Sequence, residues 1–368
     1  MNNCFNGIYK GKRVLVTGHT GFKGSWLTMW LLSLGAKVTG YSLYLPSVPC
    51  NFSVCKLDKH IEHITGDVRD LKKLETVFKK CKPEIVFHLA AQPIVKKSFE
   101  DPKLTFDTNA GGTVNIFECL RKNPFVKSAV IITSDKCYKN QEWKKGYTET
   151  DILGGDDPYS ASKACAEIVA NSYIKSFFNN KNSTRISTTR AGNVIGGGDW
   201  AADRIVPDCI RAFSNNRVVV IRNPKSTRPW QHVLEPLSGY LWLGAQLYSS
   251  AKLHGESFNF GPAKNVDQSV KEVVEALAKH WGNGRWRIDN KKRFGKETHL
   301  LKLSCEKSFK LIGWKPTLSF KETIEKTAHW YKRYYLQNGD MYSYSMAQIA
   351  EYASLALKRG SHWSRKIK

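Results

Sequence analysis

The chain has 368 residues, 41% of them hydrophobic, and carries a formal net charge of +25 at pH 7. This length exceeds the usual size of a single core, so we expect one large domain with a smaller lobe attached to it. The longest apolar runs are much shorter than the roughly 18 residues of a membrane span, and no export leader opens the sequence, which predicts no membrane partner.

The positive charge is spread along the chain rather than gathered in one place. In residues 71–80, for example, lysines alternate with apolar residues, as on the solvated face of a helix. We therefore expect no nucleic-acid partner. We interpret residues 336–368 as a basic C-terminal tail, and its dense basic run from Lys358 to Lys368 as a soluble or poorly ordered end.

The nine cysteines are an odd number, are scattered through apolar segments and include no Cys-x-x-Cys pair. This usage predicts free thiols in a reducing compartment, and hence a cytoplasmic protein. The ten histidines show no His-x-x-x-His spacing, so we expect no metal site.

The first predicted element is a strand, a glycine turn and a helix, in that order. The apolar run Arg13–Val16 leads into the sequence TGHTGFKG at 17–24, and residues 26–32 are again apolar. This order is typical of a dinucleotide-binding loop, in which glycines allow close approach of the backbone and a helix N-terminus meets the pyrophosphate. We predict cofactor contacts from Gly18, Thr20, Gly21, Phe22, Lys23 and Gly24.

Strands and helices then alternate for about half of the chain. Apolar segments predict strands at 37–43, 61–68, 84–89, 129–132 and 185–190, and helices are expected at 71–80, 107–122 and 158–178. Strands that are apolar on both faces favour an α/β fold with a Rossmann-type, doubly wound parallel sheet.

Residues 157–163, DPYSASK, predict a helix start. Asp157 can cap the helix and Pro158 suits its first position, which makes Tyr159 and Lys163 neighbours on one face. A nearby ammonium favours the phenolate, so we expect the pKa of Tyr159 to move toward neutrality. Such a tyrosine can take the proton of an alcohol that loses hydride, although the spacing alone also occurs on ordinary surface helices.

Glycine and proline breaks become frequent after Gly192. We expect residues 1–192 to form the dinucleotide-binding domain and residues 193–335 to form mainly a smaller mixed α/β lobe over the carboxyl edge of the sheet. Segments near 230–260 are expected to return to the large domain.

Six motifs together resemble the extended short-chain dehydrogenase/reductase family over about residues 12–335. They are TGHTGFKG at 17–24, GDV at 66–68, HLAAQ at 88–92, TSDK at 133–136, the Tyr159 and Lys163 pair, and RAGNVIG at 190–196. Within this family the chain is most similar to the nucleotide-sugar 4,6-dehydratases, and residues 20–27 with 134–136 resemble the members that act on CDP-glucose.

The resemblance implies a redox-neutral reaction with NAD on a nucleotide-diphosphate sugar, with CDP-glucose favoured, in deoxysugar and surface-polysaccharide biosynthesis. The C4 alcohol is oxidised, water leaves across C5 and C6, and hydride returns to C6, giving a 4-keto-6-deoxy sugar. The family also implies a homodimer or homotetramer that pairs through the Tyr159 helix and the helix before it. Other nucleotide-hexoses or nucleotide-heptoses, a 4-epimerase, and a non-catalytic RNA-binding member stay as alternatives.

In the family's terms Tyr159 takes the C4 proton, Ser134 bonds the C4 oxygen, and Asp135 protonates the departing C6 hydroxyl. Many relatives have a glutamate as the C5 base where this chain has Lys136, which would need to be a neutral amine. Lys136 is therefore either the C5 base or a group that stabilises the enolate. Lys163 completes the predicted catalytic set.

The remaining predicted contacts lie along the cofactor and the substrate. The second strand ends in a serine rather than an acid or an arginine, so the choice of NAD over NADP depends on the resemblance, with Ser42 as a ribose contact. Asp67 and Val68 match adenine contacts, although Asp67 is equally typical of a turn. Further cofactor contacts are predicted from Ala90, Ala91, Gln92 and Thr133, and the substrate diphosphate is assigned to Asn193, Arg204 and Arg228.

Overall fold

The computed structural model describes residues 4–180, 183–263, 267–289 and 301–365. Its main sheet is built from β1 (Arg13–Thr17), β2 (Lys37–Ser42), β3 (Glu62–Thr65), β4 (Ile85–His88), β5 (Ser128–Ile132), β6 (Arg185–Arg190) and β11 (Ser257–Asn259). In the described part of the chain these seven strands are all parallel, in the order β11-β6-β5-β4-β1-β2-β3. The six predicted strands are confirmed, and β11 is an additional one.

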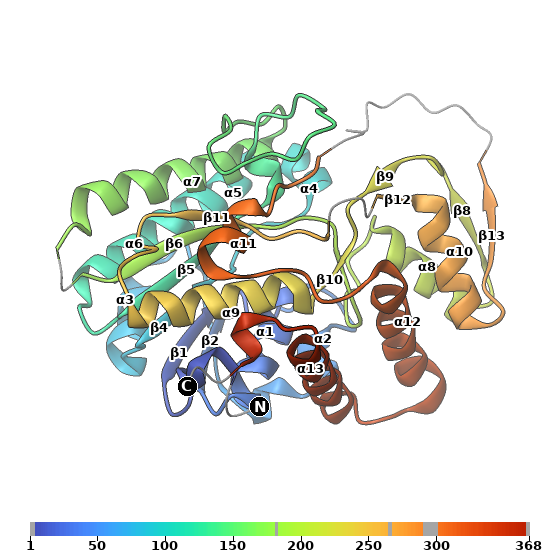
Figure 1. Cartoon of the computed structure of the whole chain (residues 1–368), viewed down its shortest axis with the longest axis horizontal. Helices are drawn as coiled ribbons and strands as arrows, with labels where there is room; N and C mark the ends of the chain where they lie inside the picture. The colour runs from blue at the N-terminus through green and yellow to red at the C-terminus, as the bar shows by residue number, and fades with distance from the viewer. Residues whose placement is uncertain (1–3, 181–182, 264–266, 290–300, 366–368) are drawn as a thin grey trace.

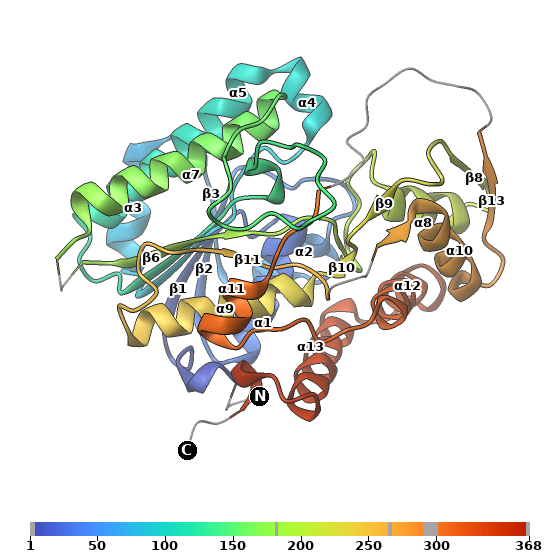
Figure 2. The ribbon, with the colours of Figure 1, turned by 45° about the horizontal axis from the view of Figure 1, so that its top comes forward.

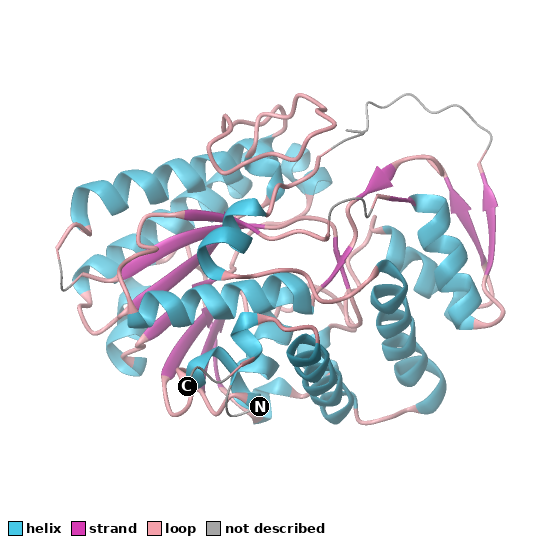
Figure 3. Cartoon of the chain, viewed as in Figure 1, coloured by secondary structure: helices cyan, strands magenta, loops and turns pink. Residues whose placement is uncertain are grey.

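Successive residues of each central strand pack on opposite faces of this sheet. Leu15 of β1 contacts a core shared with α3 (Leu71–Cys81), α6 (Gly112–Lys122) and α7 (Pro158–Phe177). Val14 and Val16 contact a second core shared with α1 (Phe22–Ser33) and α9 (Leu234–Ser249). Figure 3 shows these helices on both sides of the strands, so the expected doubly wound α/β fold is confirmed.

The helices follow the local signals of the sequence. In α3 the residues Leu74, Val77 and Phe78 are buried at helical spacing, and the Asp70 carboxylate accepts the Lys73 amide at 3.0 Å as the N-cap. The predicted helix at 107–122 is a π-helical turn, η3 (Asp107–Gly111), followed by α6. Before it lie α4 (Val95–Glu100) and α5 (Pro102–Phe106).

A smaller α/β lobe extends from one end of the molecule (Figures 1 and 2). It contains α8 (Ile205–Ser214), α10 (Val270–Trp281) and the parallel pair of β8 (Val218–Ile221) with β13 (Arg285–Ile288). Two short ladders join the lobe to the sheet region: β7 (Val194–Ile195) with β10 (Gln231–His232), and β9 (Thr227–Arg228) with β12 (Gln268–Ser269). Between these segments α9 and β11 belong to the large domain.

The C-terminal segment differs from the expected tail. After α11 (Glu306–Ile312) and α12 (Phe320–Gln337), residues of α13 (Met341–Lys358) pack on α1. Trp363 is fully buried and stacks on Phe5 with ring centroids 5.0 Å apart. The prediction of a soluble or poorly ordered end is therefore wrong for residues 358–365, because the last tryptophan and one apolar face of α13 complete the core, while 366–368 lie outside the described residues.

Candidate active site

The loop between β1 and α1 lets the backbone approach a ligand closely. Gly18 has φ +77°, and a Cβ placed there would lie 2.6 Å from the Ala90 nitrogen. A Cβ at Gly24 would lie 2.1 Å from the Gly18 oxygen. Both positions therefore require glycine. Gly21 is the N-cap of α1 and no side chain of the described residues caps this end, so the first N–H groups of the helix are available to an anion.

The other predicted residues of this loop surround the same helix start. Phe22 and Lys23 form the first turn of α1. Thr20 is buried, its hydroxyl donates to the Tyr44 carbonyl at 2.8 Å, and its amide donates to Ser42 Oγ at 3.4 Å. A loop whose glycines cannot carry a Cβ and whose helix end is uncapped fits the pyrophosphate of a dinucleotide.

Ser42 lies at the end of β2, as predicted for a ribose contact, but its hydroxyl already has partners. Ser42 Oγ lies 3.0 Å from His19 Nδ1, and His19 Nε2 lies 2.7 Å from His63 Nδ1. Burial, with His63 adding to it, lowers the pKa of His19 to about 3, so this ring is neutral. The His19 ring beside Ser42 therefore carries no charge at neutral pH.

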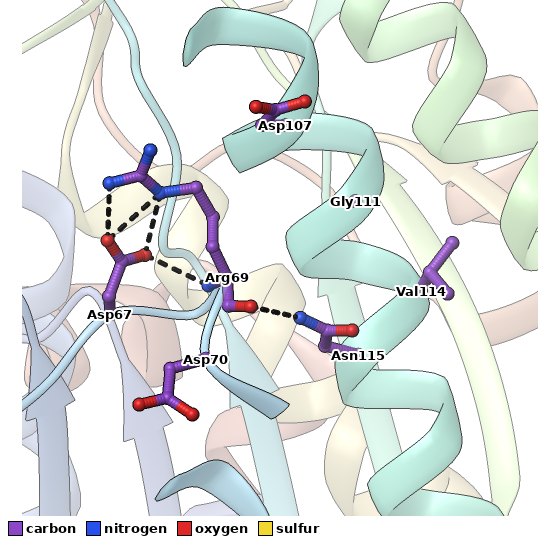
Figure 4. A pocket seen from close by; sticks show the side chains of 7 residues that line it. All are labelled: Asp67, Arg69, Asp70, Asp107, Gly111, Val114 and Asn115. Carbon is purple, nitrogen blue, oxygen red and sulfur yellow. Dashed lines mark hydrogen bonds and ion pairs between the residues drawn. The ribbon is translucent and has the colours of Figure 1, made fainter. Parts of the chain in front are cut away.

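Asp67 and Val68 follow β3, beside an open pocket of about 600 Å³ that is lined by Asp67, Arg69, Asp70, Asp107, Gly111, Val114 and Asn115. Figure 4 shows the Arg69 guanidinium folded back onto Asp67. Arg69 Nε lies 2.9 Å from Asp67 Oδ2, and the Arg69 amide donates to Asp67 Oδ1 at 2.9 Å. Burial raises the pKa of Asp67, but Arg69 outweighs that effect and the net change is downward. Asp67 is thus an ionised carboxylate in a turn at the mouth of this pocket.

Ala90, Ala91 and Gln92 follow β4, next to the glycine loop. The Ala90 amide donates to Thr17 Oγ1 at 3.3 Å. Gln92 is buried and its side chain is used within the protein, because its amide nitrogen donates to Thr105 Oγ1 at 2.9 Å and its oxygen accepts the Ile94 amide at 2.7 Å. Gln92 therefore shapes this segment through internal bonds.

The N-terminus of α7 forms as its sequence predicts. Asp157 Oδ1 accepts the Ser160 amide at 2.9 Å, and Pro158 occupies the first position. Tyr159 and Lys163 are 8% and 5% exposed, so both polar groups are enclosed rather than on a surface helix. The alternative of a chance spacing on a solvated helix does not fit this burial.

The ionisation of this pair differs from the expectation. Burial raises the pKa of Tyr159 to about 12, and a hydrogen bond with Ser134 opposes that rise in part. Burial lowers the pKa of Lys163 to about 8, and Lys23 lowers it further. The predicted fall of the Tyr159 pKa is therefore wrong in this structure, because removal of the phenol from water dominates and Asp135 adds to the rise.

Ser134, Asp135 and Lys136 follow β5 and face α7. Ser134 Oγ donates to Asp135 Oδ1 at 2.9 Å and accepts the Lys136 amide at 3.2 Å. Because the same serine contacts Tyr159, the structure joins Tyr159, Ser134 and Asp135 in one chain of polar groups. Lys136 is partly exposed next to them.

Asp135 is enclosed between two segments. A Cβ at Gly192 would lie 1.8 Å from Asp135 Oδ2, so this glycine is needed for the carboxyl group to fit. Asp135 also lines a small cavity together with Gly192, Asn193, Pro229, Gln231, Gly261, Pro262, Leu301 and Leu303. The volume of this cavity is about 10 Å³, roughly the space of one water molecule, so Asp135 borders a small internal space.

Lys23 lies closer to the chemistry than the loop motif indicates. Burial lowers its pKa to about 8, while Asp135 raises it and Arg204 lowers it. Lys23, Asp135 and Arg204 therefore converge on one region, at the start of α1, the end of β5 and the start of α8. The sequence places Lys23 only in the cofactor loop, so this proximity comes from the tertiary structure.

The three predicted diphosphate residues lie where the lobe meets the sheet. Asn193 has φ +53° and its carbonyl accepts the Gln231 amide at 3.2 Å. Arg204 Nη1 lies 2.8 Å from Asp199 Oδ2, which orients the guanidinium. Arg228 belongs to β9, and its neighbour Pro229 lines the cavity with Asp135 and Asn193.

Thr133, which is predicted to contact the cofactor, is bonded within the protein. It is buried, and its hydroxyl donates to the carboxylate of Glu167 on α7. Glu167 in turn pairs with Arg190 at the end of β6. The sequence motifs include neither Asp199 nor Glu167 as a functional residue, although Glu167 lies one helical turn after Lys163 and that spacing was an available signal.

Two further observations apply to the described residues. No group of three or more His, Cys, Asp or Glu side chains among them is arranged to hold a metal ion. No helix among them is long and apolar enough to cross a membrane.

The fold and the site define a class: a Rossmann-type member of the extended short-chain dehydrogenase/reductase group, with a tyrosine and a lysine on α7 facing the carboxyl edge of the sheet. The sequence matches the GDP-mannose 4,6-dehydratase family over residues 15–327, and the chain belongs to this family.

Individual relatives agree with this assignment. The chain is 46% identical over 352 residues to the CDP-glucose 4,6-dehydratase of Salmonella typhimurium, covering 94% of this chain and 98% of that protein. A UDP-glucose 4-epimerase of Thermus thermophilus, solved in complex with NAD, superposes with a TM-score of 0.74 at 26% identity over 87% of this chain and 99% of that one. An epimerase of Methanothermobacter thermautotrophicus has a TM-score of 0.76 at 24% identity, covering 94% and 96% of the two chains, and shows the shared fold.

Proposed function

We propose that this protein is an NAD-dependent CDP-glucose 4,6-dehydratase that forms CDP-4-keto-6-deoxyglucose. The observation that carries the proposal is the enclosed chain Tyr159, Ser134 and Asp135 beside Lys136, in a sequence 46% identical to a CDP-glucose 4,6-dehydratase. An alcohol oxidation needs the tyrosine, and loss of the C6 hydroxyl needs an acid such as Asp135.

The cofactor is assigned to the glycine loop and the strand ends around it. Gly18, Gly21 and Gly24 let the backbone approach the pyrophosphate, and the first turn of α1 supplies N–H groups to it. When bound, NAD⁺ supplies the hydride acceptor for C4, the donor for C6 and a positive charge that favours the phenolate. Ser42 and Asp67 are proposed for the ribose and the adenine.

The protein residues would move the protons. Tyr159 accepts the C4 hydroxyl proton while Ser134 bonds the same oxygen, which leaves a ketone that acidifies the C5 hydrogen. Lys136 either removes the C5 proton as a neutral amine or stabilises the enolate. Asp135 acts as the acid that donates a proton to the leaving C6 oxygen, and water departs. A proton returned to C5 and hydride at C6 then give the 4-keto-6-deoxy sugar, so atoms and electrons balance.

The substrate diphosphate is assigned to Asn193, Arg204 and Arg228, and residues 193–335 are proposed as mainly the nucleotide-sugar lobe. An arginine fork suits paired phosphate oxygens. Asp199 holds Arg204 in place, so this arginine is already oriented toward the region of Lys23 and Asp135.

The test is to incubate the protein with NAD⁺ and, side by side, the CDP, UDP, GDP and dTDP forms of glucose. We expect CDP-glucose to give a product lighter by one water, with a C4 ketone by NMR and no accumulation of NADH. Deuterium placed at C4 should be recovered at C6 of the same molecule.

Other results separate the alternatives. A C4 epimer of unchanged mass would show a 4-epimerase, and accumulation of NADH would show a simple dehydrogenase. Efficient dehydration of a sugar attached to a different nucleotide would support the 4,6-dehydratase reaction and would show that the base of the substrate is not cytosine. The absence of turnover with every sugar nucleotide would contradict the proposal.

A dimer or tetramer through α6 and α7 is part of the proposal. The support is a row of partly or fully exposed small and apolar side chains along α7, which includes Ile168, 55% exposed. Ile168→Lys should lower the mass measured by light scattering to that of a smaller assembly. Leu357→Lys on α13, where the side chain is 51% exposed, is the matched control and should leave it unchanged.

The location is proposed from the cysteines. All nine lie in the described residues and are free thiols, which suits a reducing compartment such as the cytoplasm.

A further inference from the structure

Directly behind the candidate catalytic residues lies a buried ion pair that the proposed mechanism does not use. Glu167 of α7 and Arg190 of β6 are each 3% exposed. Arg190 Nε lies 2.9 Å from Glu167 Oε1, and Arg190 Nη2 lies 2.8 Å from Glu167 Oε2, so the guanidinium binds the carboxylate with two parallel bonds. Burial raises the pKa of Glu167, but Arg190 outweighs it and the carboxylate is ionised.

The pair links three elements that each carry a site residue. Glu167 lies one turn after Lys163 on α7, and Thr133, whose hydroxyl donates to Glu167 Oε1, precedes Ser134 at the end of β5. Arg190 ends β6, three residues before Asn193. The second carboxylate oxygen of Glu167 accepts a hydrogen bond from Thr188 Oγ1 of β6 at 2.7 Å.

Arg190 extends the network to the segment after β5 and to β11. Its Nη1 donates to Tyr138 Oη at 2.7 Å, and its guanidinium lies 4.8 Å from the centroid of the same ring. Tyr138 follows Lys136 by two residues and donates to Asn259 Oδ1 at 2.8 Å. The segment that carries Ser134, Asp135 and Lys136 is therefore fastened at both ends to the Glu167–Arg190 pair.

The groups that face Lys163 differ in the sign of their charge. Lys23 approaches from α1, neutral His88 from β4, and Cys137 from the segment after β5, while Tyr159 lies one turn earlier on α7. Glu167 is the one carboxylate among the described groups that act on Lys163.

We propose that Glu167 is a positioning residue: with Arg190 and Thr133 it fixes α7 against the end of β5, and its carboxylate, which is already paired with Arg190, also acts on Lys163 one turn earlier on α7. A buried charge pair is a poor way to gain stability, since an apolar pair of equal volume is often as good. The Glu167–Arg190 pair acts by fixing geometry, because the two carboxylate oxygens of Glu167 orient Thr133 and Arg190. The part that concerns turnover depends on the proposed function.

The charge can be tested in the protein without any ligand. Glu167→Gln keeps the shape and removes the charge, leaving the Arg190 cation unbalanced. With ¹³Cε-labelled lysine, and Lys163→Arg to assign the signal, NMR should show a fall in the pKa of Lys163. Glu235→Gln, which removes an equally buried carboxyl group on α9, is the matched control and should leave the Lys163 titration unchanged. An unchanged Lys163 titration in Glu167→Gln would overturn the proposal.

The positioning is tested with a matched pair of milder variants that keep the ion pair. Thr133→Val removes the bond from Glu167 to the end of β5, whereas Thr188→Val removes the equivalent bond from Glu167 to β6. We expect Thr133→Val to lower kcat about 10- to 100-fold with little change in KM, and Thr188→Val to have a much smaller effect. Equal effects of the two variants would overturn the positioning role. This test does not depend on Glu167→Gln, so it still decides the question if that variant fails to fold.

The turnover assay tests the proposed function independently of the NMR titration. If the wild-type protein converts no sugar nucleotide, the function is wrong, and the NMR titration still decides the role of the Glu167 charge.

Discussion

Two glutamates in this protein are buried to the same degree and behave in opposite ways. Glu167 lies in the catalytic edge, by which we mean the ends of β5 and β6 with the first three turns of α7. Glu235 lies in the C-terminal anchor, formed by Glu235, Thr317, Leu318 and Tyr352. Glu167 and Glu235 are 3% and 1% exposed, but the pKa of Glu167 is lowered, and that of Glu235 is raised to about 7.

The difference lies in the partners of each carboxyl group. Arg190 supplies Glu167 with a full opposite charge at 2.8 Å. Glu235 is desolvated, and its partners are the Thr317 and Leu318 amides and the Tyr352 hydroxyl, which oppose the rise in pKa without cancelling it. Burial alone therefore does not decide ionisation; a charged partner does. An ionic network therefore stabilises the catalytic edge. The anchor is stabilised by a hydrogen-bonded network whose carboxyl group, Glu235, takes up a proton near neutral pH.

The largest difference between the catalytic edge and the anchor should come from changing one tyrosine in each region to phenylalanine. Tyr159→Phe removes the proposed acid and base, so kcat should fall about 10²- to 10⁴-fold. Tyr352→Phe removes the hydroxyl that donates to Glu235 at 2.8 Å, and it should lower stability and leave kcat unchanged. Steady-state kinetics and urea denaturation measure both. Full turnover by Tyr159→Phe would show that the catalytic assignment is wrong.

The second effect is the cost of breaking the ionic network. Arg190→Met leaves the Glu167 charge buried without its partner, so the free energy of unfolding should fall by about 3–5 kcal/mol. Arg359→Met breaks the more exposed pair with Glu322, and should cost about 0–1 kcal/mol. Denaturant unfolding at one pH measures the difference. Equal costs would mean that the Arg190 pair is not the dominant contact of the catalytic edge.

The third effect concerns pH in the anchor. The pKa of Glu235 is raised from 4.5 to about 7, so the stability from this group is fully present below pH 4.5 and is lost as the pH rises through about 7. Between about pH 5 and 8 the wild type should lose about 2–3 kcal/mol relative to Glu235→Gln. Unfolding curves of both proteins across this range measure it. A constant difference would show that Glu235 is ionised throughout.

The smallest effect compares two helix caps. Asp157 caps α7 in the catalytic edge, and Asp340 caps α13, where Oδ1 accepts the Tyr342 amide at 3.0 Å. Each change to alanine should cost about 1 kcal/mol of stability. Asp157→Ala should also lower kcat, because Tyr159 is in the first turn of α7, whereas Asp340→Ala should not. A loss of activity in both would argue that stability alone limits turnover.

The two regions also differ in how much of their structure could be predicted from the sequence. The ends of strands and the starts of helices are local events, so the Gly18–Gly24 loop, the Asp157 cap and the order of β1 to β6 followed from neighbouring residues. The C-terminal segment was misjudged because its lysines and arginines are conspicuous in the sequence, whereas the buried face of α13 and Trp363 depends on α1.

The amino-acid sequence by itself determined the fold class, the glycine loop after β1 and the residues at the carboxyl ends of the strands, since in a parallel sheet those ends meet at one edge. Only the tertiary structure decided which groups meet across the chain: Glu167 with Arg190, Asp135 with Gly192, and Lys23 with Asp135. It also decided their ionisation, as the raised pKa of Tyr159 shows. The physical reason is that a charge responds to its removal from water and to partners distant in sequence, and neither is encoded in local spacing.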